Sequence, residues 1–102
     1  MRRNIKPDEK IDVLMTARDK HLLLEHSLAD PEYAERLEPI PGSADLLGRY
    51  TLDDLEDILG YIAAEANHTE DAKLQTELDA LHEHLYTIQR SYDDGSWNDS
   101  SF

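Results

Sequence analysis

Histidines and carboxylates are the only side chains in this sequence that could build a metal site, because the chain has no cysteine. Glu65 and His68 form a Glu-x-x-His pair, the spacing that puts both ligands on one helix face in di-iron bundles. Such sites also need a second pair and two further glutamates. His84 is the third candidate ligand, and a symmetric dimer would have to complete the site. Because the pattern is short and common, we predict no bound metal and keep a carboxylate and histidine site as an alternative.

Nothing in the chain is typical of a catalytic centre. No serine lies in a Gly-x-Ser-x-Gly elbow, and the four glycines are too scattered to form a phosphate-binding loop. We therefore predict a protein that is not an enzyme and that uses no cofactor.

The charge of the chain is strongly acidic and unevenly distributed. There are 23 acidic and 10 basic residues, for a net charge of -13, while residues 1–20 alone carry +2. The remaining body, at -15, repels nucleic acid phosphates and anionic membrane surfaces. We expect neither nucleic acid nor membrane as a direct partner, and an acidic body of this kind also suits binding to a basic surface on another protein.

No segment predicts export or membrane insertion. The basic start of the chain runs into Asp8-Glu9-Lys10, where a signal peptide needs an apolar stretch, and the longest run of large apolar residues is Leu22-Leu23-Leu24. The sequence therefore predicts a cytoplasmic protein.

Apolar residues recur at helical spacing along most of the chain, and no four or more residues alternate as a half-buried strand would. We predict an all-α fold, a small helical bundle in which 1–92 form one helical domain and 93–102 an acidic C-terminal tail. Three main helices are expected at about 8–29, 52–67 and 70–92, with a short helix near 31–38.

The boundaries of the later helices rest on capping signals and on helical phase. Thr51 and Asp54 have the spacing of a capping box, and Asp30 followed by Pro31 is typical of a helix start. The apolar stripe slips in phase near residues 67–69, which favours an antiparallel hairpin of the last two helices. A bend in one long helix is the alternative.

Function is predicted from the apolar faces. The first helix carries two adjoining apolar stripes, which need two partner helices of the same chain, or one helix and another subunit, to cover them. We predict a self-associating protein–protein interaction module, a homodimer. The alternative is an acidic inhibitor or regulator that binds a basic, nucleic-acid-binding surface of another protein. The tail either docks on its own domain or binds a partner. The residues predicted at the interface are Leu22, Leu24, Leu28, Leu78, Leu85 and Trp97.

Overall fold

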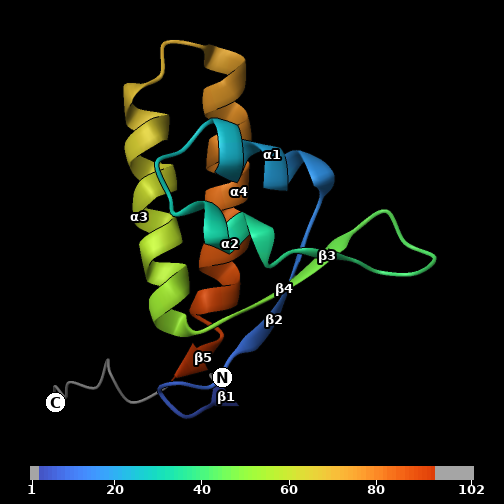
Figure 1. Ribbon diagram of the computed structural model, residues 1–102. Helices are drawn as coiled ribbons and strands as arrows, with labels where there is room; N and C mark the ends of the chain where they lie inside the picture. The colour runs from blue at the N-terminus through green and yellow to red at the C-terminus, as the bar shows by residue number, and fades with distance from the viewer. Residues whose placement is uncertain (1–2, 94–102) are drawn as a thin grey trace, which may run out of the picture.

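The computed structural model describes residues 3–93 and contains a sheet as well as helices, so the predicted all-α bundle is wrong (Figure 1). The helices are α1 (Ala17–Glu25), α2 (Pro31–Glu35), α3 (Leu52–His68) and α4 (Ala72–Gln89). The strands are β1 (Arg3–Asn4), β2 (Ile11–Met15), β3 (Glu38–Pro39), β4 (Leu46–Tyr50) and β5 (Tyr92–Asp93).

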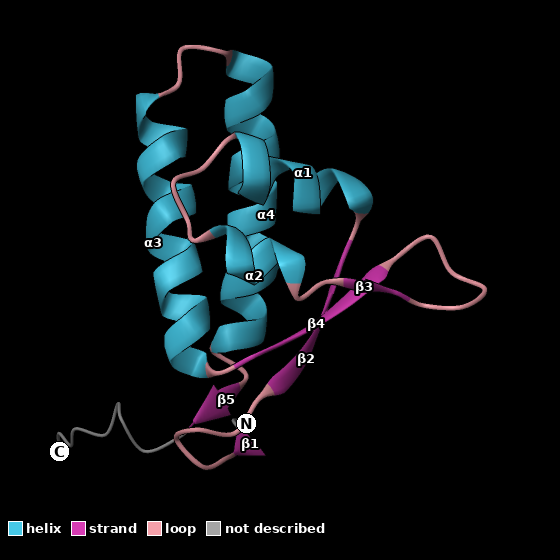
Figure 2. Cartoon of the chain, viewed as in Figure 1, coloured by secondary structure: helices cyan, strands magenta, loops and turns pink. Residues whose placement is uncertain are grey.

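The two long helices, α3 and α4, lie side by side and form the predicted hairpin (Figure 2). The capping box that begins α3 is confirmed: the Thr51 hydroxyl accepts from the Asp54 amide, and the Asp54 carboxylate accepts from the Thr51 amide. The chain turns after His68, and Asp71 caps α4 by accepting from two backbone amides of its first turn. The segment between the helices is therefore a turn, and α4 ends at Gln89, before the predicted boundary.

The first predicted helix, 8–29, is wrong in its first half, which forms β2. Ile11, Val13 and Met15 point into the core, while Asp12 and Leu14 point outward. The sequence does not show this alternation clearly, because the outward Leu14 is apolar and residues 13–15 form a continuous apolar run. Helix α1 begins only after Thr16, which forms its own capping box.

The second departure from the prediction lies between α2 and α3. The short helix ends at Glu35, and the chain then enters β3 and, after a turn at Gly42, β4. β4 is the central strand, antiparallel to β2 on one side and to β3 on the other.

The inner face of the sheet packs on the helices, and Tyr50 fills the space between them. The Tyr50 ring crosses Gly48, where an added Cβ would lie 2.6 Å from Tyr50 Cε2 and 2.9 Å from Leu37 Cδ2. Its hydroxyl donates to the Tyr33 carbonyl. Glycine at this position is therefore what allows the tyrosine to lie across the sheet. The outer face remains open to solvent, as antiparallel sheets allow.

The two ends of the described chain meet in a separate parallel pair, β1 with β5. The Arg3 amide donates to the Ser91 carbonyl at 2.8 Å, which ties the start of the chain to the end of α4. Of the tail predicted at 93–102, Asp93 belongs to β5, and residues 94–102, including Trp97, lie outside the described residues. Within residues 3–93, no helix combines the length and the apolar character needed to cross a membrane.

Candidate functional site

The structure separates the predicted interface residues into two groups. Leu22, Leu78 and Leu85 belong to the hydrophobic core and are at most 1% exposed, so they cannot contact a partner in this fold. Leu24 is 40% exposed and Leu28 is 83% exposed. Of the five leucines predicted at the interface, only Leu24 and Leu28 lie at the surface.

The connector between α1 and α2 holds Leu28 outward. On one side of it the Ser27 hydroxyl donates to the Leu23 carbonyl at 2.9 Å and accepts from the Ala29 amide at 3.2 Å. On the other side Ala29 is buried, and Asp30 caps α2. Because both neighbours are fixed, Leu28 projects from a tightly bonded turn and not from a loose loop.

Leu28 lies beside a hollow on the outer side of α3, in a surface that we call the Leu28 cleft. Its other lining residues are Tyr61, Ala64, Glu65 and His68, and its volume is about 260 Å³. Tyr61 is 40% exposed, so two large apolar side chains lie exposed in one cleft. The His68 Nδ1–H donates to the Ala64 carbonyl at 2.8 Å, which fixes the imidazole against the last turn of α3.

The candidate metal ligands are divided between two places. Glu65 and His68 both line the Leu28 cleft, whereas His84 lies at the free edge of the sheet, where its Nε2–H donates to the Leu14 carbonyl at 2.7 Å. Across residues 3–93 no group of three or more histidines and carboxylates is arranged to hold a metal ion. His84 instead satisfies a carbonyl of the edge strand β2.

A polar network that was not predicted joins α2, β4 and the start of α3. Arg36 donates to Asp54 at 2.8 Å, and its guanidinium lies 5.4 Å from the Tyr33 ring centroid and 5.5 Å from that of Tyr50. Burial is the largest single influence on the Asp54 carboxyl and raises its pKa, but the hydrogen bonds from Arg36 and Thr51 and the positive charge of Arg36 together outweigh burial, so the pKa is lowered overall. Burial raises the pKa of Tyr50 to about 12. No spacing signal links these residues in the sequence, since the network forms only once the sheet is in place.

Few of the acidic side chains are neutralised. The ion pairs of residues 3–93 engage the carboxylates of Asp12, Glu32, Asp54 and Glu77. Glu77 takes two hydrogen bonds from Arg18, at 2.7 and 2.9 Å, and the pKa of its carboxyl is lowered by them. Most of the other carboxylates are exposed, so the surface is negative apart from a few basic positions.

The chain matches no family model, no curated protein and no solved structure.

Proposed function

We propose that this protein is a non-enzymatic protein–protein interaction module that self-associates through the Leu28 cleft. The observation that carries the proposal is the exposure of Leu28, 83%, on a connector whose neighbouring residues are anchored. Burying a leucine side chain stabilises by about 1.5–3 kcal/mol relative to leaving it in water. A fixed, exposed leucine beside an exposed tyrosine is the kind of surface that a partner covers.

A second copy of the chain is the occupant that this geometry favours. The projecting leucine and the hollow lie side by side, so a two-fold axis between them places the Leu28 of each copy in the hollow of the other. Burial of both copies of Leu28 contributes roughly 3–6 kcal/mol. That is close to the lower end of the cost of association, about 4 kcal/mol. Burial of the two leucines therefore only offsets the cost of association. A dimer that forms at tens of micromolar protein needs a net of about 6 kcal/mol, which the rest of the contact, including both copies of Tyr61, would have to supply.

Sedimentation velocity between low and high micromolar concentration tests the proposal. The wild-type mass should approach twice the 11.7 kDa of the chain, and Leu28→Asp should remain monomeric. Tyr61→Gln should weaken association, whereas Tyr86→Gln, at an equally exposed tyrosine on α4, should not. A wild-type monomer at the highest concentration would refute self-association, and a dimer that survives Leu28→Asp would refute the role of the cleft.

The acidic surface supports a second function, the inhibition or regulation of a protein that presents a basic, nucleic-acid-binding surface. The observation in its favour is the small number of ion pairs in the described part of the chain, which leaves the carboxylates available to a basic partner. The two functions respond oppositely to salt. Two acidic copies repel each other, so salt should strengthen the dimer, whereas salt should weaken a complex with a basic partner.

A further inference from the structure

The outer side of the sheet contains a cleft that gathers basic side chains in an otherwise acidic molecule. It has a volume of about 460 Å³ and is lined by Lys10, Arg36, Glu38, Leu47 and Arg49. Three of the chain's ten basic residues therefore surround one hollow. We call it the basic cleft.

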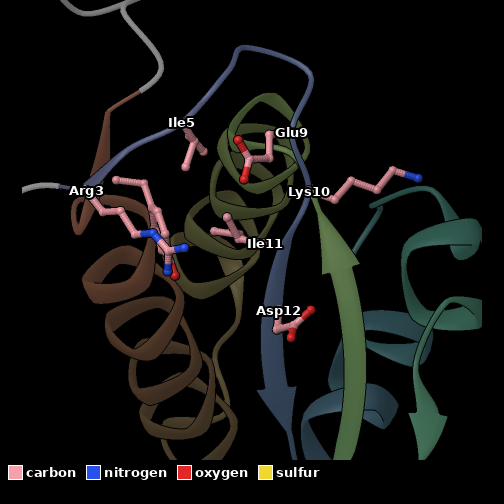
Figure 3. Close-up of a pocket in the computed structure, with 7 residues that line it drawn as sticks. Arg3, Ile5, Glu9, Lys10, Ile11 and Asp12 are labelled. Carbon is pink, nitrogen blue, oxygen red and sulfur yellow. The ribbon is translucent and has the colours of Figure 1, made fainter.

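The register of the strands brings these residues together. Asp12 and Arg49 are directly opposite each other on β2 and β4, and Leu47 is opposite Glu38 on β3. Arg36 reaches the same place from the end of α2, where its Nη1 lies 3.4 Å from the Arg49 carbonyl oxygen. Lys10 precedes β2, and Figure 3 shows its side chain extending toward β4 and α2, away from Arg3.

The three basic side chains differ in how many of their hydrogen-bond donors are already bonded within the protein. Arg36 is held by Asp54 and lies over two tyrosine rings, so it is a fixed part of the wall. Arg49 gives only its Nε–H to Asp12, at 3.0 Å, and among residues 3–93 neither terminal nitrogen has a hydrogen-bond acceptor. Lys10 forms no ion pair within that range. The cleft thus presents the fork of one arginine and one lysine to a ligand.

We propose that the basic cleft binds a small molecule through a single phosphate group. An arginine fork pairs with two phosphate oxygens, and the lysine supplies a second cation beside it. The carboxylates of Glu38 in the lining and of Asp12 beside Arg49 offset part of this charge. The cleft is in the size range of small-molecule sites, about 300–1,000 Å³, and Leu47 provides an apolar wall for the rest of the ligand. The net charge of -13 repels long polyanions, which restricts the site to a small anion.

A titration with inorganic phosphate, followed by backbone amide shifts in two-dimensional NMR at fixed pH and ionic strength, tests this site. Saturable shifts are expected at Lys10, Glu38, Leu47 and Arg49, with a dissociation constant on the order of 1–10 mM. Arg49→Gln should weaken binding roughly tenfold, as loss of a charge-assisted hydrogen bond implies. The substitution should leave the fold intact, because the Arg49 and Asp12 side chains are each about two-thirds exposed and such pairs contribute little.

Matched controls separate a site from general charge effects. Lys10→Gln should weaken phosphate binding, whereas Lys73→Gln, the same change on α4, should not. The proposal is overturned if the shifts do not saturate, if Lys73→Gln weakens binding as much as Lys10→Gln, or if acetate binds as tightly as phosphate. The basic cleft and the Leu28 cleft share no lining residue, so Leu28→Asp should leave phosphate binding unchanged. Phosphate binding and self-association are therefore tested independently of each other.

Discussion

Gly48→Ala is the most direct test of how the sheet meets the helices. The new methyl group would lie 2.6 Å from Tyr50 Cε2, 2.8 Å from its hydroxyl oxygen and 2.9 Å from Leu37 Cδ2. All three distances are shorter than carbon and oxygen atoms tolerate. Tyr50 is fully buried, so its ring has no solvent space into which to move. The ring must rotate within the core and give up its hydrogen bond to the Tyr33 carbonyl.

The loss of stability in Gly48→Ala follows from the steric overlap and from the lost hydrogen bond. Overpacking a core costs about 1–3 kcal/mol, and the lost hydrogen bond costs about 1 kcal/mol. The free energy of unfolding should therefore fall by roughly 2–4 kcal/mol, out of the about 5–15 kcal/mol typical of a domain. Urea denaturation followed by circular dichroism measures the change, with the urea dependence of the free energy expected to stay the same.

Gly60→Ala is the matched control, because a Cβ at this position of α3 meets nothing within 4 Å. It should stabilise the protein by up to about 1 kcal/mol through helix propensity. A second control is Tyr50→Leu, in whose background Gly48→Ala should cost clearly less, since the clashing ring is gone. If Gly48→Ala is as stable as the wild type, or costs the same in both backgrounds, the packing argument is wrong.

Three further predictions concern charge and capping. The pKa of Tyr50 is raised to about 12, so the stability contributed by its protonated hydroxyl is complete below pH 10 and is lost between pH 10 and 12. Alkaline denaturation should show a loss of roughly 2–3 kcal/mol in the free energy of unfolding. Tyr50→Phe should reduce that loss. The pKa of Asp54 is lowered from 3.8, so its contribution is present above that value and is lost as the pH falls below it; Asp54→Asn should flatten this acid limb of the stability curve. Thr51→Ala should lower the free energy of unfolding by about 1 kcal/mol in urea denaturation, because the Asp54 amide loses its acceptor; an unchanged value would contradict the capping role.

The helical hairpin was predictable because its signals are local. Thr51 and Asp54 identify the start of α3 within four residues, and the phase slip after Ala66 locates the turn from the spacing of apolar residues alone. Both signals depend on neighbours along the chain and not on the tertiary fold.

The sheet was missed for a physical reason that can be traced to particular residues. Leu14 and Leu47 are opposite each other on the outer face, so apolar residues occupy both sides of β2 and β4. Gly48 occupies an inward position without any apolar side chain, and the Tyr50 ring fills its place. The two strands therefore lack the alternation that identifies a half-buried strand.

The same error misplaced part of the candidate interface. Without a sheet, the helices have too little partner surface to cover Leu22, Leu78 and Leu85, and these residues were assigned to a dimer contact. In the structure they share one core with Val13 and the rest of the inner sheet face. The exposure of Leu28 depends on how the connector is anchored, which only the folded chain reveals.

The strand pairing also has a consequence for the order of folding. The hairpin of α3 and α4 joins neighbouring segments, whereas β2 must pair with β4 across the whole of α1, α2 and β3, and β1 with β5 across almost the full described chain. Contacts between distant segments form slowly because a long loop must close first. We expect the hairpin to form first and the strands to close last. Until β2 reaches β4, its apolar residues remain uncovered in the partly folded chain, and refolding yield should decrease as protein concentration rises.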